Sequence, residues 1–148
     1  MSLAPEELRS VARTHQIWGW IGLLLFAGFG MVLEILNGLK LGFYLDPEVH
    51  LRREMWRLGH VHGTLLSVVQ LVFAFSVSQG WLASVDRTRL ASFFFRGALV
   101  LLPGGFLLGG VNPSESDPWI GIWLVPVGAA FLLLALGLTV LEVVKSSQ

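Results

Sequence analysis

Long apolar runs dominate the chain, and short polar connections separate them. Along these runs the polar positions follow neither the 3.6-residue period of an amphipathic surface helix nor the two-residue period of a half-buried strand. A helix rises about 1.5 Å per residue, so each run is long enough to cross a hydrocarbon layer of about 30 Å. The pattern therefore predicts four membrane-spanning helices, near residues 17–36, 61–81, 92–110 and 119–141.

The composition strengthens this prediction. Hydrophobic residues make up 54% of the 148 and charged residues only 14%, whereas about a quarter of a soluble domain is charged. The formal net charge is zero and no basic block occurs, so we expect no nucleic-acid partner. The chain contains no cysteine, which excludes disulfides and thiolate-ligated metal centres. We expect one all-α, integral membrane domain, a four-helix bundle over residues 1–148.

Positively charged residues indicate the orientation of the bundle. With both termini on one side, that side carries six of the ten lysines and arginines. The positive-inside rule then favours cytoplasmic termini. We expect the protein in a bacterial cytoplasmic (inner) membrane, surrounded by lipid and associated with further copies of itself or with other membrane subunits.

The connection between the first two spans carries the signature of a helix start. Asp46 is a helix-capping residue type, Pro47 suits the first helical position, and Glu48 places an acid in the first turn. We therefore predict a short extra helix over residues 47–59. This helix would either lie in the membrane interface or continue into the second span.

Polar residues of the second span gather on one face when the helix is projected at about 100° per residue. Arg53, Trp56 and Arg57 continue this face towards the preceding loop, whereas His62 points about 200° away from His60, towards lipid or another subunit. The two histidines therefore cannot bind one ion from a regular helix. The predicted polar stripe consists of His60, Thr64, Ser67, Gln70 and Ser78.

Ionisable residues in the membrane are costly and normally have a partner or a function. Glu34 lies near the same end of the bundle as His60, so it is predicted to meet His60 and Arg53 or Arg57 in one cluster. This cluster is either a salt bridge that fixes helix register or a ligand or proton-transfer site. At the opposite end, Arg96 and Glu142 are predicted to form a structural pair, and His15 is expected at the interface.

The segment Gly59-His60-Val61-His62-Gly63 resembles part of the haem–copper-oxidase-like membrane proteins, including haem-binding relatives linked to nitric oxide stress. Together with Glu34 it is also similar to small uncharacterised bacterial four-helix membrane proteins. The resemblance covers the first two spans, about half of the chain. It implies that His60 or His62 is an axial haem ligand or a copper ligand. The later spans contain no histidine, so they supply no second imidazole.

Two kinds of cofactor site are compatible with these residues. Haem b or a quinone would place its propionates or head group at Arg53 and Arg57, with Trp56 stacking beside it. A copper or zinc ion would need a mixed set of nitrogen and oxygen ligands. The candidate metal ligands are His60, Glu34, His62, His50 and Glu54.

Three functions follow from this sequence. The first is a redox-associated module that binds haem, quinone or a metal ion near His60. The second is a structural or accessory subunit of a larger membrane complex. The third is a proton or small-solute path along the polar stripe. The chain has no nucleophile elbow, zinc-protease motif or phosphate-binding loop, so we do not expect a stand-alone enzyme.

Overall fold

A computed structural model describes residues 3–45, 50–82, 84–114 and 116–146. These residues form helices and no strand, and four of the helices are long and apolar enough to cross a membrane. The predicted all-α, four-helix membrane bundle is confirmed. Two short elements lie in the connections. The elements are α1 (Leu3–Gly38), α2 (Gly42–Leu45), α3 (His50–Ser78), α4 (Val85–Gly109), the 3₁₀ turn η2 (Ile120–Trp123) and α5 (Leu124–Ser146).

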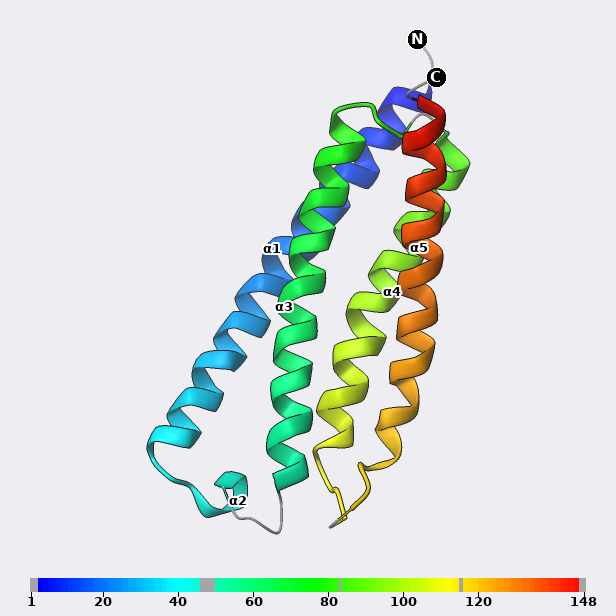
Figure 1. Cartoon of the computed structure of the whole chain (residues 1–148). Helices are drawn as coiled ribbons and strands as arrows, with labels where there is room; N and C mark the ends of the chain where they lie inside the picture. Colours follow the sequence, from blue (N-terminus) through cyan, green and yellow to red (C-terminus); the bar gives the residue numbers. More distant parts are fainter. Residues whose placement is uncertain (1–2, 46–49, 83, 115, 147–148) are drawn as a thin grey trace.

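The long helices pack in chain order, so that α3 lies beside α1 and α4, and α4 lies beside α5 (Figure 1). The first turns of α1 and the last turns of α5 lie at the same end of the bundle, which we call the terminal end. The opposite end carries α2 and η2, and we call it the loop end. Towards the loop end, α1 leans away from α3.

Each long helix extends beyond its predicted span at one end or both, although α3 and α4 end slightly before the predicted ends and α5 begins after the predicted start. The second spanning helix begins at His50 and continues without a break through the second span. Residues 50–59 of the predicted 47–59 helix are therefore the first part of α3. Asp46, Pro47 and Glu48 lie outside the described residues. The separate short helix of this connection is α2, which lies before the predicted position.

Glycines allow α4 and α5 to approach closely. A Cβ on Gly105 would lie 2.9 Å from the backbone nitrogen of Val125, and a Cβ on Gly128 would lie 2.6 Å from the backbone nitrogen of Leu102. Backbone cannot move aside as a flexible side chain can. Small residues therefore set the distance between these two helices, as is common in membranes.

The buried carboxylate at the terminal end has a different partner from the predicted one. Glu142 is 5% exposed and accepts hydrogen bonds from Arg87 Nη1 at 2.6 Å and from the Ser84 backbone N–H at 3.0 Å. Arg96 instead donates from Nε to the Ser92 carbonyl at 3.4 Å. The predicted Arg96–Glu142 pair is wrong because the last turns of α5 meet the first turn of α4, and Arg96 lies roughly 13 Å further along that helix.

Candidate functional site

A cavity of about 800 Å³ lies between the loop-end halves of α1 and α3, beside α2. Its polar lining includes Glu34 from α1 and Arg53, Arg57 and His60 from α3. The four side chains that the sequence predicted to meet thus line one cavity. The apolar and small residues around them include Ala27, Gly30, Met31, Leu33, Ile35 and Val61.

The charged groups of this cavity are not paired with one another. Among the described residues, the ion pairs within 4.0 Å join Arg87 to Glu142 and Arg89 to Glu7, and none involves Glu34, Arg53 or Arg57. The alternative that this cluster is a register-fixing salt bridge is therefore wrong for the described residues. Among the described residues, the lining holds two guanidinium groups against one carboxylate, which makes it attractive to an anion.

The orientation of the His60 ring is set by α1. His60 Nδ1 lies 2.7 Å from the Phe26 carbonyl oxygen, and because a carbonyl only accepts, Nδ1 must carry the hydrogen. In the neutral ring, Nε2 then keeps its lone pair. The ring lies against Gly30, where a Cβ would come 2.8 Å from Nε2 and 2.7 Å from Nδ1. Gly30 thus provides the space that the imidazole occupies.

Tyr44 of α2 is a cavity residue that the sequence analysis missed. Its side chain is buried, 2% exposed, although it belongs to a connection between spans. Burial raises the pKa of the Tyr44 phenol above its ordinary value, against the opposing effect of Arg57 and Arg53. The phenol therefore remains a neutral hydrogen-bond donor next to the two arginines.

Trp56 does not line the cavity, so its predicted stacking on a ligand stays a prediction. The indole Nε1 donates to the Leu107 carbonyl of α4 at 3.2 Å, and the ring stacks on Tyr44 with centroids 6.2 Å apart. Arg52, which was not a predicted site residue, makes a similar connection. Its guanidinium donates to the carbonyls of Phe43 at 2.8 Å and Gly110 at 3.2 Å. Both side chains fix α3 to neighbouring backbone at the loop end.

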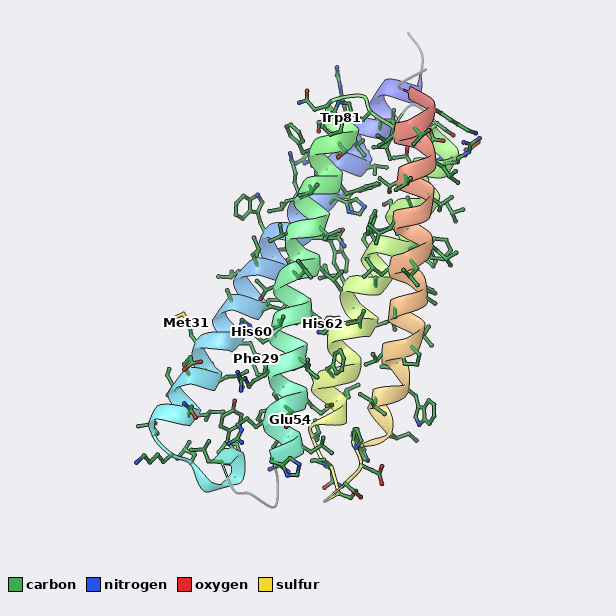
Figure 2. All side chains as sticks on the ribbon, viewed as in Figure 1. Phe29, Met31, Glu54, His60, His62 and Trp81 are labelled. Carbon is green, nitrogen blue, oxygen red and sulfur yellow. The ribbon has the colours of Figure 1, made fainter. Side chains whose placement is uncertain are left out.

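His62 lies on the α4 side of α3, away from His60, as Figure 2 shows. Its ring stacks on Phe106, with centroids 4.9 Å apart, and its Nδ1 donates to the Leu58 carbonyl at 2.8 Å. The separation of the two histidines is confirmed. His62 packs against α4 but is only partly buried, so its orientation towards lipid or another subunit stays a prediction. Glu54 is exposed and lies further towards the loop end.

The predicted metal ligands do not come together in the part of the chain that the structure describes. There, no group of three histidine, cysteine, aspartate or glutamate side chains could hold a metal ion. Neither His50 nor Glu54 lines the cavity. A copper or zinc ion therefore stays a prediction without a ligand set among these residues.

The polar stripe of α3 is buried in the bundle over only part of its predicted length. Ser67 and Gln70 are fully buried, and Thr64 is half-buried. Ser78, at the last position of the helix, is exposed and donates to the Ala74 carbonyl at 2.8 Å. The stripe therefore does not continue along α3 to the terminal end.

His15 is wholly buried rather than interfacial. Its Nε2 lies 2.8 Å from the Ser92 hydroxyl of α4, and its ring meets Phe73 of α3 edge-on. The prediction is wrong because α1 begins at Leu3. The apolar run near residue 17 marks neither the start of the helix nor the start of its packed face.

Comparison of the chain with protein-family models, curated proteins and solved structures gave no match. The resemblance of residues 59–63 to haem–copper-oxidase-like proteins therefore stays a prediction. Packing accounts for both glycines of this segment. A Cβ on Gly59 would lie 2.7 Å from the Leu107 side chain of α4, and a Cβ on Gly63 would overlap the Phe26 ring of α1. Both glycines let a neighbouring helix approach α3.

Proposed function

We propose that the protein is a redox-associated membrane module that binds haem b in the loop-end cavity, with His60 as its single axial protein ligand. One observation carries the proposal. An imidazole whose Nδ1–H is committed to the Phe26 carbonyl shares a cavity with two arginines that have no acidic partner among the described residues. Metal-binding histidines are commonly oriented by such a bond from the other ring nitrogen.

The number of metal-ligating side chains in this cavity suits haem better than a bare metal ion. The porphyrin brings four nitrogen ligands, so one histidine completes a five-coordinate iron. A copper or zinc ion would need at least three protein groups. The two haem propionates match Arg53 and Arg57 in charge, and such charge-assisted hydrogen bonds are stronger than those between neutral groups. Tyr44 offers a further neutral donor beside them.

The walls of the cavity suit an amphipathic ligand. A volume of about 800 Å³ falls in the range of roughly 300–1,000 Å³ that is typical of cofactor sites. Met31, Ile35 and Val61 line it and are at least 55% exposed to the surroundings of the bundle. The cavity is thus accessible between α1 and α3, from the side that lipid covers in a membrane. An apolar ring system would lie against these residues, with its carboxylates towards the arginines.

Titration of the purified protein with haemin in detergent tests the proposal. We expect a Soret band that saturates with one haem per chain, and its loss in His60→Ala. His62→Ala is the matched control, because the second histidine stacks on Phe106 outside the cavity. Arg53→Gln with Arg57→Gln should weaken binding without removing the band. Equal binding by wild type and His60→Ala would refute the assignment.

A quinone head group is the second candidate for the same cavity, because the lateral opening and the donors Arg53, Arg57 and Tyr44 would also suit its carbonyl oxygens. A short-chain ubiquinone analogue that bound the wild type but not the double arginine variant, in a protein that ignored haemin, would favour it. The alternatives of an accessory subunit and a solute path stay predictions. The proposal retains a bacterial inner membrane with cytoplasmic termini, and further copies or subunits as neighbours.

A further inference from the structure

A second polar site lies inside the terminal half of the bundle, remote from the loop-end cavity. It consists of His15 of α1, Gln70 of α3 and Thr88 and Ser92 of α4, which we call the buried polar centre. His15, Gln70 and Thr88 have no exposed surface, and Ser92 is 4% exposed. Three helices thus direct polar side chains into a region that is otherwise apolar, which is costly unless these groups are satisfied.

Direct contacts satisfy only part of this centre. His15 Nε2 lies 2.8 Å from the Ser92 hydroxyl, and the Gln70 amide nitrogen donates to the Phe95 carbonyl at 2.8 Å. The imidazole is enclosed by Phe73 and Phe95, with ring centroids 4.6 and 6.5 Å away. The two apolar rings fix the position of the imidazole, and the polar side chains of the centre lie beside it.

Three buried polar atoms of the centre have no hydrogen-bond partner: His15 Nδ1, Gln70 Oε1 and Thr88 Oγ1. No direct hydrogen bond joins these atoms to one another. Buried polar groups in this situation are normally bridged by internal water, which makes about three hydrogen bonds. The ring nitrogen of His15 can donate to or accept from such a water, Gln70 Oε1 can accept from it, and the Thr88 hydroxyl can do either.

We propose that the buried polar centre binds internal water, which exchanges protons with the His15 ring. Thr88 lies one helical turn from Ser92 towards that end, and its own backbone N–H binds the Ser84 carbonyl. Ser84 in turn contacts Glu142, which pairs with the partly exposed Arg87. The terminal end is therefore the direction from which we expect water to reach the centre.

This proton exchange leaves the imidazole uncharged. A proton from water forms a bond with His15 Nδ1 while the proton on Nε2 passes to the Ser92 hydroxyl oxygen. The Ser92 hydroxyl releases its original proton to water beside Thr88, so charge and atoms balance and nothing is oxidised or reduced. The reverse transfer restores the first tautomer. Arg96 of α4 is the charged group whose field reaches the ring, whereas α3 presents the uncharged Gln70 and Phe73.

The polar stripe of α3 continues from Gln70 towards the loop-end cavity, but a close contact between α1 and α3 interrupts it. Ser67 lies one turn further along α3, donates to the Gly63 carbonyl at 2.7 Å and packs directly against Gly22 of α1. Beyond it, the buried Thr64 hydroxyl also lacks a partner and lies one turn from His60. The contact between Ser67 and Gly22 thus separates the buried polar centre from the cavity.

Magic-angle-spinning NMR of the full chain in lipid bilayers, with ¹⁵N-labelled histidine, tests the proposal without any added ligand. We expect magnetisation from water to reach the His15 ring as readily as it reaches exposed His50, and the ring N–H to exchange in D₂O. Thr88→Val and Gln70→Leu should abolish the water signal at His15. Ser78→Ala is the matched control, because that hydroxyl is bonded to its own helix on the exposed face.

A dry centre would give the opposite results. The His15 ring would then receive water magnetisation no faster than the Phe95 backbone, and its N–H would exchange as slowly as backbone in α4. Thermal unfolding gives an independent readout, because Thr88→Val keeps the shape of the side chain. It lowers the melting temperature if the hydroxyl binds water, and raises it if the hydroxyl is merely unsatisfied. The test requires no haem, so its result is independent of the proposed cofactor.

Discussion

The substitution Gly30→Ala perturbs the His60 ligand position through a single methyl group. A Cβ at this position would lie 2.7 Å from His60 Nδ1 and 2.8 Å from Nε2. The ring carbon Cε1 would lie closer still, and ordinary van der Waals contact begins at 3.4 Å. The ring must therefore retreat by more than about 0.7 Å, beyond the tolerance of roughly 0.5 Å for a functional constellation. The imidazole is the end of a side chain, so we expect the ring rather than the helix to move.

The movement of the ring should reduce haem affinity strongly but folding stability only modestly. Loss of the Phe26 hydrogen bond costs about 1–3 kcal/mol, because it leaves the His60 Nδ1–H without its acceptor. The better helix propensity of alanine returns about 1 kcal/mol. Net stability should therefore fall by no more than about 2 kcal/mol. Haem affinity should fall at least tenfold, which corresponds to about 1.4 kcal/mol.

Haemin titration followed at the Soret band measures this change, and thermal unfolding in the same detergent measures stability. Gly28→Ala is a matched control two residues away on α1, because its Cβ would meet nothing within 4 Å. It should bind haemin as the wild type does. Undiminished binding by Gly30→Ala would refute His60 ligation, and equal loss in both variants would assign the effect to the helix rather than to the ring.

Two further predictions concern charge and ionisation. Arg87→Gln leaves the buried Glu142 carboxylate without its cation, so detergent unfolding should show a loss of about 1–3 kcal/mol, reduced from that of a fully buried pair by the partial exposure of Arg87. The exposed pair of Arg89 with Glu7, at 3.7 Å, is the control, and Arg89→Gln should cost less than about 0.5 kcal/mol; equal losses would contradict the burial argument. Tyr44 is the one tyrosine of the chain, so absorbance at phenolate wavelengths reports its pKa, which should exceed the ordinary value of about 10. Because the folded-state pKa is the higher one, the folded state binds more protons above pH 10 and stability should fall there as pH rises; a midpoint at or below 10 would refute the burial of the phenol.

The number and type of the helices were predictable because lipid imposes a simple requirement. A segment must be apolar for about 20 residues and must satisfy its backbone internally. The ends of the helices were less predictable, since a helix can continue into water on either side of the apolar run. This explains the misplaced His15, which lies twelve residues inside a helix that begins at Leu3.

The clustering around the cavity was also predictable in part. Glu34 and His60 lie at similar depth in the membrane on two antiparallel neighbouring helices. Depth alone was therefore enough to predict that they share a site with Arg53 or Arg57. Projection along one helix separated His60 from His62 but did not reveal that α4 covers the second histidine.

The position of Tyr44 depends on the path of a connection, which no period in the sequence reports. The pairing of Glu142 likewise required the register between α4 and α5. Close backbone contacts such as the one between Gly128 and Leu102 set this register. Such contacts depend on the three-dimensional packing of both helices rather than on the pattern of either one.

The absorption spectrum of the wild-type protein, purified in mild detergent from haem-replete cells, tests the central claim most directly. The spectrum is recorded in the oxidised state and again after reduction with dithionite. The account predicts a Soret band that shifts on reduction and that is absent from His60→Ala purified in the same way. A colourless wild-type protein that also fails to take up added haemin would contradict it.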